Sequence, residues 1–569
     1  MTETSAPDPL DSPDPRAVAE HAHLESLLRC WARETNTPVE GDALLVDLPT
    51  TGLALRAPVR HASPTGWHRF GRVSLLRGGT GVGPADPVVA VALVAAELGA
   101  SRPGGERPGE AADLVERTAE SVRRVARYVA HGRAETSSPV ADGFLDAEQG
   151  LLLGHLHHPA PKSRDGISSG DDALFAPELR GSFPLFWFAA DAGIVSHGSV
   201  AGPAAPVLMA ELAGRSSADG RVLVPAHPWQ ARDLLHRPRI AALVRSGRLT
   251  PLGESGPAWF PTSSLRTVYR PGAPVMLKLS LGLRLTNSRR ESTSTELRRG
   301  SEVHRLLETG RAAGTFAAHP SFDVVRDPSW IAVDEGGEVT GLDVAVRSSP
   351  ADITDSRVVA GLVAPRPGIG RSRLAELVGR GDPARWVADY VDHVLVPVLS
   401  LYAETGIGLE AHQQNTLVRV GAGGRVTGGR YRDNQGYYLA SSRLPEVLRH
   451  LGVERSALAV ADDDVVDERL SYYLLRNQAL AVVGCLAVDG LADERDLLRV
   501  VTERLTAALP ALAAAGPGGD RLARRWLTAD TLPCKANLLT RLHGIDEVLA
   551  PVDAQSVYLD APNPLAEVR

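Results

Sequence analysis

Apolar and polar residues follow helical spacing at the start of the chain, strand-like alternation in the middle and helical spacing again towards the end. In the middle, runs such as FPLFWFAA and RVLVPAH predict a strand-rich region between about 180 and 350. From about Pro383 onward the spacing is helical, interrupted by strand-like TLVRVGAGGRV and a polar loop, RYRDNQG. In the first part we expect helices over 17–34, 87–98 and 110–129 and strands over 43–48 and 52–59.

These changes of pattern divide the chain into a tail and three domains. Residues 1–16 are acidic and rich in proline, which predicts a disordered tail. We expect an N-terminal domain over 17–140, a second domain over 141–350 and a largely helical third domain over 351–569. A chain of 569 residues is too long for one ordinary core, so more than one domain is expected.

The clearest strand is predicted over residues 275–286, where leucines alternate with polar or small residues. Such alternation usually marks a strand with one solvated face. In this chain, however, the polar face carries a lysine and small residues, which leave room for a ligand, so we expect Lys278 to point into a cleft. The leucine face consists of Leu277, Leu279, Leu281, Leu283 and Leu285. The opposite face consists of Met276, Lys278, Ser280, Gly282, Arg284 and Thr286.

Composition narrows the class of protein. Hydrophobic residues make up 43% and charged residues 23%, which is typical of a globular protein, and the net charge of −7 argues against nucleic-acid binding. Apolar runs are too short to span a bilayer, and the N-terminus lacks the basic and apolar regions of a secretory signal. Cys30, Cys485 and Cys534 are isolated, which argues against a disulfide framework and fits a reducing cytoplasm.

Lysine is rare in this chain, which makes its positions informative. Lysine and arginine together number 61, yet only Lys162, Lys278 and Lys535 are lysines. Arginine therefore serves wherever a solvated positive charge is enough, whereas a lysine offers a compact ammonium on a slim stem. Each of the three lies in a motif-like stretch, so we interpret them as candidate site residues.

Hydroxyl and guanidinium groups flank Lys278 in the sequence. Ser264, Arg266 and Thr267 precede the strand, and Arg289 and Arg290 follow it. Groups of these kinds around one lysine suit phosphate oxygens and carboxylates. The chain has no GxxxxGK[ST] motif, so this is not a P-loop.

A second polar segment reads LEAHQQN and is followed by RDNQG. Its His412 and Asn415, and then Asp433, are similar in spacing to the catalytic and metal-binding loops of kinase-like folds. Glu410, Asn415 and Asp433 offer the hard oxygen ligands that Mg²⁺ prefers. The segment lies between an apolar helix and an apolar strand, where a purely structural role for so many polar residues is unusual.

A third segment, GHLHHPAPKSRDG, begins at Gly154. Its three histidines invite a zinc-site interpretation, but no Cys or HExxH partner is near in the sequence. We favour an anion-binding loop that includes His155, Lys162 and Arg164. HPWQ at His227 could supply a further zinc ligand and also fits a strand-to-helix turn.

Together these segments resemble one family, the siderophore synthetases of the IucA/IucC type, which work without peptide-synthetase machinery. The resemblance covers roughly 140–565, and the first 140 residues carry no matching motif. The chain departs from the family's GHPxHPxxKxR element at Leu156, where proline is usual. The matching elements are 154–164, HPWQ at 227–230, Ser264 to Thr267, Lys278 with Thr286 and Arg290, Glu410 to Asn415, Arg432 to Gly436, and the closing Lys535, Arg541 and 563–565.

The resemblance implies an α+β, multi-domain fold shaped like a cupped hand, with thumb, fingers and a kinase-like palm, and a helical C-terminal region. It implies an ATP- and Mg²⁺-dependent ligase. A carboxylate of the acid attacks the α-phosphate, pyrophosphate leaves, and an amine or hydroxylamine then displaces AMP from the acyl-adenylate. The implied partners are a carboxylic acid and a polyamine, hydroxylamine or amino acid, together with a second copy of the chain, and no nucleic acid or membrane.

The resemblance also assigns roles to residues. Catalysis falls to Lys278, Arg266, His412 and Arg290. Nucleotide binding falls to His155, Lys162, Arg164, Ser264, Arg266, Lys278, Gln414, Asn415 and Asp433. The acid or its adenylate would contact His155, Thr286, Arg290, His412 and Gln414. Magnesium would be held by Glu410, Asn415 and Asp433.

Several alternatives stay open at this point. Citrate is the favoured acid because the cations are more numerous than one carboxylate needs, and the 159–164 stretch looks closer to citrate-activating members. A citrate mono-amide, 2-oxoglutarate and a succinyl-hydroxamate are the alternatives. Another class of function is a kinase-like phosphotransferase, which would release ADP. A further one is a ferric-siderophore reductase or binder, against which the isolated cysteines speak.

Overall fold

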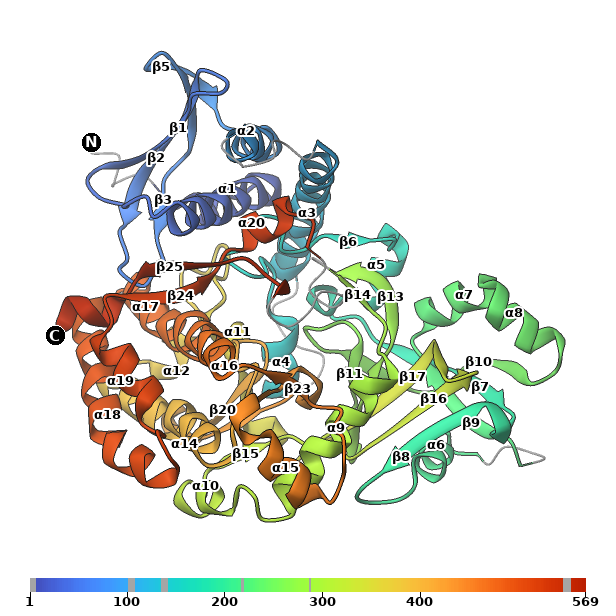
Figure 1. Ribbon diagram of the computed structural model, residues 1–569. Coiled ribbons are helices and arrows are strands. Elements are labelled where there is room, and N and C mark those ends of the chain that lie inside the picture. Colours follow the sequence, from blue (N-terminus) through green and yellow to red (C-terminus); the bar gives the residue numbers. More distant parts are fainter. Residues whose placement is uncertain (1–6, 101–107, 135–141, 216–219, 286–287, 546–553) are drawn as a thin grey trace.

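A computed structural model describes residues 7–100, 108–134, 142–215, 220–285, 288–545 and 554–569. Thr286, which is predicted to contact the acid, lies outside these residues. The described chain mixes helices and sheets, as expected (Figure 1). Blue N-terminal elements, a green and yellow sheet region, and orange to red C-terminal helices occupy separate parts of the molecule.

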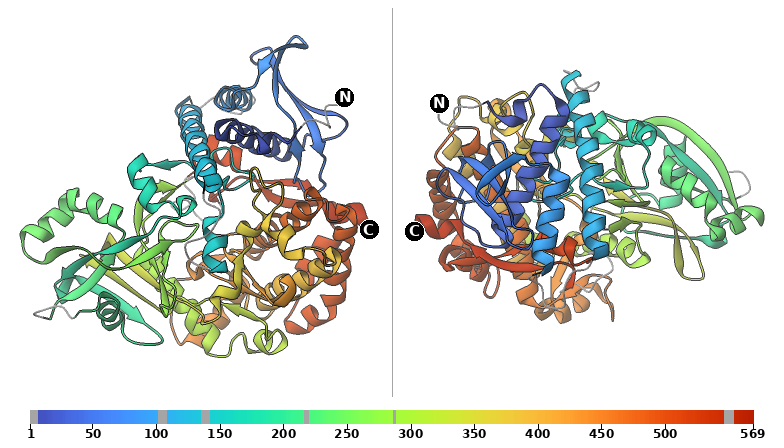
Figure 2. Two further views of the ribbon diagram at one scale, coloured as in Figure 1. Left: turned by 180° about the vertical axis from the view of Figure 1, so that it is seen from behind. Right: turned by 90° about the horizontal axis from the view of Figure 1, so that it is seen from above.

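The N-terminal elements confirm the predicted order of helices and strands. A twisted antiparallel sheet follows α1 and precedes α2, and seen from above α1 and α3 lie side by side (Figure 2). Asp14 caps the first helix, whose Pro15 needs no hydrogen-bond partner for its nitrogen. The elements are α1 (Pro15–Glu34), β1 (Ala43–Leu48), β2 (Leu53–His61), β4 (Ser74–Arg77), β5 (Thr80–Pro84), α2 (Pro87–Ala100) and α3 (Pro108–Ala134).

The prediction of a disordered tail over 1–16 is wrong for its second half. Leu10 is 4% exposed and packs with Val18 and Val125 from the first and third helices. Asp8 forms an ion pair of 2.8 Å with Arg69. One buried leucine and one partly buried ion pair fix a segment whose composition alone looks disordered, because composition does not register individual long-range contacts.

The middle of the chain builds a large sheet whose strands run in an order far from that of the sequence. Apolar β7 lies between β9 and β10, and β12 lies between β11 and β17. The strands, in spatial order, are β8 (Val195–Ser199), β16 (Ser329–Glu335), β17 (Glu338–Ser348), β12 (Val275–Leu279), β11 (Thr267–Tyr269), β10 (Leu249–Pro261), β7 (Phe183–Ala190) and β9 (Val222–Ala226).

The predicted strand over 275–286 is two strands rather than one. After β12 the chain passes at Ser280 into β13 (Leu281–Leu285), which pairs instead with β14 (Ser288–Arg290) and β6 (Arg164–Asp165). The break occurs because the Ser280 hydroxyl donates to the buried carboxylate of Asp343, at 2.7 and 2.8 Å. The leucine face is confirmed, since Leu277, Leu279, Leu281 and Leu283 are each at most 1% exposed in one core.

The C-terminal part is mostly helical. Besides the two-stranded sheet of β24 (Thr531–Lys535) and β25 (Tyr558–Pro562), its described residues form two small sheets. One contains β15 (Phe322–Val324), β21 (Val426–Tyr431), β20 (Thr416–Val420) and β18 (Ser356–Val358), and the other contains β19 (Ile407–Gly408), β22 (Tyr438–Ala440) and β23 (Ala459–Ala461). The polar LEAHQQN segment connects β19 to β20, and RDNQG connects β21 to β22. The surrounding helices include α13 (Pro383–Tyr390), α14 (Val396–Thr405), α16 (Asp463–Leu470), α17 (Leu480–Val488) and α18 (Glu494–Ala515).

Hydrophobic cores cross the domain boundaries expected near 140 and 350. Val303 and Leu306 of α9 (Ser294–Glu308) belong to the C-terminal core, although both precede residue 350. Leu538 and Leu542 of α20 (Asn537–Leu542) pack instead into the core of the N-terminal part. The end of the chain therefore returns to its beginning. None of the helices over the described ranges is both long and apolar enough to cross a membrane.

Candidate active site

Lys278 and Asp433 meet at the centre of the candidate site. The Lys278 side chain is 4% exposed and its ammonium forms an ion pair with Asp433, which follows β21 in a left-handed conformation with φ of 72°. Arg347 of β17 also contacts Asp433, at 3.2 Å, and is held by Asp327 at 2.8 Å. Burial alone would raise the pKa of Asp433, but Lys278 and Arg347 outweigh it, so its pKa lies well below its usual range.

A tight turn between β10 and β11 presents Ser264 and Arg266 beside Lys278. Leu265 has a φ of 63°, and the Ser264 hydroxyl accepts the Thr267 amide hydrogen at 3.1 Å, which stabilises the turn. The Arg266 guanidinium donates to the backbone oxygen of Arg290 at 2.7 Å. Arg266 thereby holds the segment that carries the Arg290 side chain, for which the described part of the chain provides no hydrogen bond or ion pair.

The LEAHQQN segment is a turn that brings four predicted residues together. Asn415 is 6% exposed and donates its side-chain amide to the Glu410 backbone oxygen at 3.1 Å, while the same nitrogen lies 3.3 Å from His412 Nε2. The Gln414 amide donates to Ser263 at 3.2 Å, next to Ser264. The LEAHQQN turn therefore contacts the turn that contains Ser264, and it also lies near Asp433, the partner of Lys278.

Two buried groups that sequence reasoning missed hold these turns in place. Glu148 of α4 (Gly143–Gln149) is fully buried, pairs with Arg432 at 2.6 Å and accepts the Ser263 hydroxyl at 2.7 Å. Arg347 is the other group. Arg347 could have been recognised from the sequence, because Asp343 and Arg347 alternate with valines along β17 just as Lys278 alternates with leucines along β12. Glu148 lies in an ordinary helical pattern and gave no comparable signal.

His155 and His412 lie near enough to one another for their charges to interact. The His155 ring is open to solvent, yet it lies deep in the protein, so burial lowers its pKa to about 3, with His158, Arg33, His412 and Lys535 adding. Burial likewise lowers the pKa of His412 to about 4, although Asp433 opposes the shift. Both imidazoles are therefore neutral at pH 7. His155 Nε2 lies 2.9 Å from the Asn477 side-chain amide.

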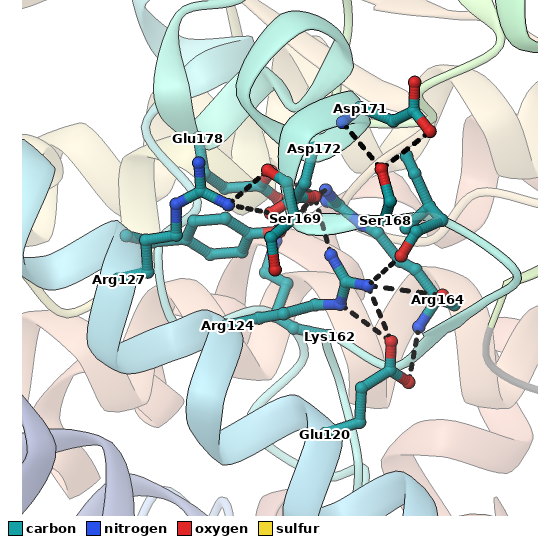
Figure 3. A network of polar contacts seen from close by, with 12 residues as sticks. Glu120, Arg124, Arg127, Lys162, Arg164, Ser168, Ser169, Asp171, Asp172 and Glu178 are labelled. Carbon is teal, nitrogen blue, oxygen red and sulfur yellow. Dashed lines mark hydrogen bonds and ion pairs between the residues drawn. The ribbon is translucent and has the colours of Figure 1, made fainter.

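Lys162 and Arg164 have a setting different from the one expected. Both are buried and pair with Glu178, Arg164 at 2.7 Å, within a network that joins α3 to α5 (Ser169–Phe175) (Figure 3). Arg164 also contacts Asp172 at 3.1 Å. Because carboxylates already neutralise both cations, their role in nucleotide binding stays a prediction and is not part of the site proposed below.

The Lys162 stem nevertheless touches the loop that carries His155. Gly154 has a φ of +79°, and a Cβ at that position would lie 2.9 Å from the Pro161 side chain and 3.0 Å from Cε of Lys162. The loop thus folds back tightly on itself, with His155 next to the contact. The Asn537 side chain of α20 donates to the His157 backbone oxygen at 2.7 Å, which fixes the same loop from the C-terminal side.

The oxygen ligands expected for magnesium lie around one turn. A Cβ at Gly436 would lie 2.2 Å from a carboxylate oxygen of Glu410, so only glycine allows this carboxylate to pack against the turn that begins at Asp433. Glu410, Asn415 and Asp433 fit a cation that also binds phosphate oxygens. Within the described ranges no three His, Cys, Asp or Glu side chains are grouped as a metal site, so the zinc interpretation of HLHH has no support.

Comparison with known proteins identifies close relatives along nearly the whole chain. The IucA / IucC family model matches residues 143–364, and a model described as ferric iron reductase FhuF-like transporter matches residues 384–549. The chain is 36% identical to the rhizobactin siderophore biosynthesis protein RhbC of Rhizobium meliloti, over 96% of this chain and 98% of the relative. It is 31% identical to the spermidine-citrate ligase of Bacillus anthracis, over 97% and 98%.

The fold has a solved counterpart as well. The ATP-bound aerobactin synthetase IucA of Klebsiella pneumoniae superposes with a TM-score of 0.81 at 26% identity, over 97% of this chain and all of that chain. The similarity includes the first 140 residues, in which the sequence had offered no motif.

Proposed function

Because the chain belongs to the IucA/IucC family of siderophore synthetases, we propose that it is an ATP-dependent ligase that adenylates citrate and condenses it with an amine. The relatives support both halves of this proposal. One is named a spermidine-citrate ligase, and the structural counterpart is an ATP-bound synthetase. One observation carries the proposal: Lys278, Arg347 and Asp433 meet beside the Glu410–Asn415 turn. Lys278 and Asp433 come together although 155 residues separate them in the sequence.

The first half-reaction uses the cations for charge stabilisation. An oxygen of one citrate carboxylate forms a bond to the α-phosphorus, and the bond to the bridging oxygen breaks as pyrophosphate leaves. Negative charge develops on the phosphoryl oxygens, where preorganised cations lower the barrier most. Arg266 is held in place before substrate binds by its bond to the Arg290 backbone oxygen, and the Ser264 hydroxyl would contribute a further donor.

Lys278 has to exchange partners when ATP binds. In this structure its ammonium contacts Asp433, which a phosphate oxygen would replace. Arg347 stays with Asp327, so Asp433 keeps one neutralising neighbour. Glu410, Asn415 and Asp433 would then hold Mg²⁺, which when bound neutralises phosphate charge and orients the pyrophosphate leaving group.

The second half-reaction needs a neutral amine. Its nitrogen attacks the acyl carbon, the bond from that carbon to the AMP oxygen breaks, and the amine loses one proton. His155 and His412 are neutral at pH 7, so they bind the acid by hydrogen bonds and either can accept a proton. Arg290, together with these rings and Gln414, would hold the acid, with Thr286 as a further predicted contact.

The finer features of the family resemblance are part of this proposal. They include the cupped-hand arrangement with a kinase-like palm and a homodimer. They also include a polyamine, hydroxylamine or amino acid as the nucleophile, and a cytoplasmic location, which the use of ATP favours. A reductase is not proposed despite the FhuF-like match. Cys30, Cys485 and Cys534 are buried and unpaired, on α1, α17 and β24 (Thr531–Lys535), and form no ligand group among the described residues.

Product analysis tests the proposal directly. The purified protein is incubated with ATP, Mg²⁺ and citrate, 2-oxoglutarate, succinate or a succinyl-hydroxamate, and hydroxylamine traps the activated acid. We expect AMP, pyrophosphate and a citryl-hydroxamate. ADP as the nucleotide product would favour the kinase-like alternative, whereas a succinyl product without a citryl product would overturn citrate and leave the ligase chemistry intact.

A further inference from the structure

The last turn of α1 extends from the N-terminal part towards the candidate site. Glu34 is 8% exposed and accepts the backbone amide hydrogens of Leu538 and Leu539 at 2.9 and 2.8 Å, at the start of α20. Cys30, one turn earlier, is 1% exposed. The end of α1 is therefore docked onto the C-terminal part, beside α20 (Figure 1). Arg33 lies between these two anchored positions, so its backbone is fixed.

The Arg33 guanidinium lies near the backbone of Gly66, which in turn contacts His157 in the loop that carries His155. Gly66 has a φ of +83°, and a Cβ there would lie 3.8 Å from both Arg33 Nη2 and His157 Nε2. The His157 ring in turn lies 6.2 Å from the His155 ring, between centroids. The backbone at Gly66 thus lies between the Arg33 guanidinium and the His157 ring and is close to both.

Unlike the buried arginines near it, half-buried Arg33 has no hydrogen bond or ion pair with a described residue. Arg29, one turn away on α1, pairs with Glu25 at 3.0 Å, and Arg164 pairs with Glu178. For Arg33, no hydrogen bond or ion pair is found over the described ranges, although its side chain is partly enclosed. The neighbouring Glu34 directs its carboxylate oxygens to the backbone amides of Leu538 and Leu539 at the start of α20 rather than to Arg33. An enclosed cation without an anion is costly unless a ligand supplies one.

The surroundings of Arg33 are cationic and polar. Its charge contributes to the low pKa of both His155 and His157, after burial itself. Lys535 lies near His155 and His412, and Arg476 donates to the Ala561 backbone oxygen at 2.7 Å. A ligand with several negative charges suits these surroundings better than a single carboxylate does.

We propose that Arg33 binds a carboxylate of the acid substrate, one that is not being activated, so that the N-terminal part of the chain contributes directly to the acid site. The proposal rests on the proposed function. A guanidinium offers two parallel donors to one carboxylate, which fixes the orientation of the acid as well as its affinity. Arg33 would thereby select acids with more than one carboxylate, and the first 140 residues, which match no motif, would help decide the substrate.

The test compares Arg33→Gln and Arg33→Lys with wild type in the full-length protein. Arg16→Gln is the matched control, because it lies on the same helix with a side chain 71% exposed. Rates of pyrophosphate release give KM for citrate and for ATP separately, and thermal unfolding reports on folding. For Arg33→Gln we expect KM for citrate to rise about 10- to 100-fold, as for loss of one charged partner, with KM for ATP within about 3-fold. Arg33→Lys should recover part of the loss.

A shortened acid provides a second measurement that a purely structural role would not affect. If Arg33 contacts a carboxylate, a citrate mono-amide that lacks that carboxylate already loses the contact, so wild type and Arg33→Gln should use it at similar rates. Equal losses with citrate and with every mono-amide, or a rise in KM for ATP instead, would overturn the inference. If wild type fails to activate citrate at all, the proposed function fails first; if wild type is active and Arg33→Gln is unchanged, only this inference fails.

Discussion

The Lys278 ammonium contacts the carboxylate of Asp433, although 155 residues separate them in the sequence. The contact joins strand β12 of the large sheet to the turn after β21 in the C-terminal part. The two charges neutralise each other in this contact. In the proposed reaction a phosphate of ATP would replace Asp433 at Lys278, and Mg²⁺ would bind Asp433. The arrangement also limits which side chain fits, because Arg347 already occupies the other side of Asp433.

Lys278→Arg should be strongly deleterious although it keeps the charge. The lysine is 4% exposed between Asp433 and the neighbouring strands, and a guanidinium needs more room than an ammonium. We expect kcat/KM to fall by about 100-fold or more, as for a lost transition-state contact. Pyrophosphate release with citrate measures this. A variant within a few-fold of wild type, with unchanged thermal unfolding, would show that Lys278 lies outside the chemistry.

Asp433→Asn should raise the Mg²⁺ concentration needed for half-maximal activity by about 10-fold, as for loss of one charged ligand. Folding should survive, because Asp327 still neutralises Arg347. A magnesium titration of activity together with circular dichroism checks both parts. Asp323→Asn is the matched control, since Asp323 contacts Arg326 at the surface with a side chain 48% exposed. An unfolded Asp433→Asn protein would make Asp433 structural and remove the support for the metal assignment.

Glu178→Gln should destabilise the protein because it leaves Lys162 and Arg164 with less negative charge in a buried network (Figure 3). Breaking one side of a buried ion pair typically costs about 3–5 kcal/mol, which chemical denaturation measures. Through the contact of Lys162 with Gly154, the variant should also raise KM for citrate more than KM for ATP. Equal changes in both constants would mean that the network does not position His155.

The same network predicts that the free energy of unfolding depends on pH below about pH 4.5. Burial would raise the pKa of Glu178, but Arg164 and Lys162 lower it to about 2, below its ordinary value of 4.5. The ionised form is therefore favoured in the folded state, so its stabilising contribution is complete above pH 4.5 and is lost as the pH falls from 4.5 towards 2. Glu178→Gln should show a flatter decline of the unfolding free energy over that window.

Protonation of buried histidines should lower the free energy of unfolding below about pH 6.5, which is a higher pH than that at which Glu178 acts. Burial lowers the pKa of His23 to about 4, and those of His155 and His412 also lie below the ordinary 6.5. The unfolded chain binds these protons more readily, so acid favours unfolding as the pH falls from 6.5 towards 4. Unfolding temperatures at pH 8, 6.5 and 5 test this. Replacing His23, which contacts Ser121 at 2.7 Å, with Gln should reduce the difference between pH 6.5 and 5.

Local patterns predicted most helices and strands because periodicity reflects which face of an element is buried. The helix that ends at Glu34 and the leucine face of Leu277 to Leu283 are examples, and both are confirmed. The break at Ser280 was not predictable, since it depends on a buried carboxylate, Asp343, that belongs to a strand formed some 60 residues later. The ordered segment around Leu10 escaped prediction for the same reason.

By itself, the sequence determined the family and the reaction class and predicted a set of site residues such as Lys278, His412 and Asp433, because chemistry restricts which residue types and spacings a site tolerates. Only the tertiary structure decided which charges meet. It pairs Lys162 with Glu178 and, over the described residues, gives the Arg33 guanidinium near Gly66 no hydrogen bond or ion pair. The physical reason is that neutralisation of a buried charge depends on distances between segments remote in the chain, which a linear order of residues does not contain.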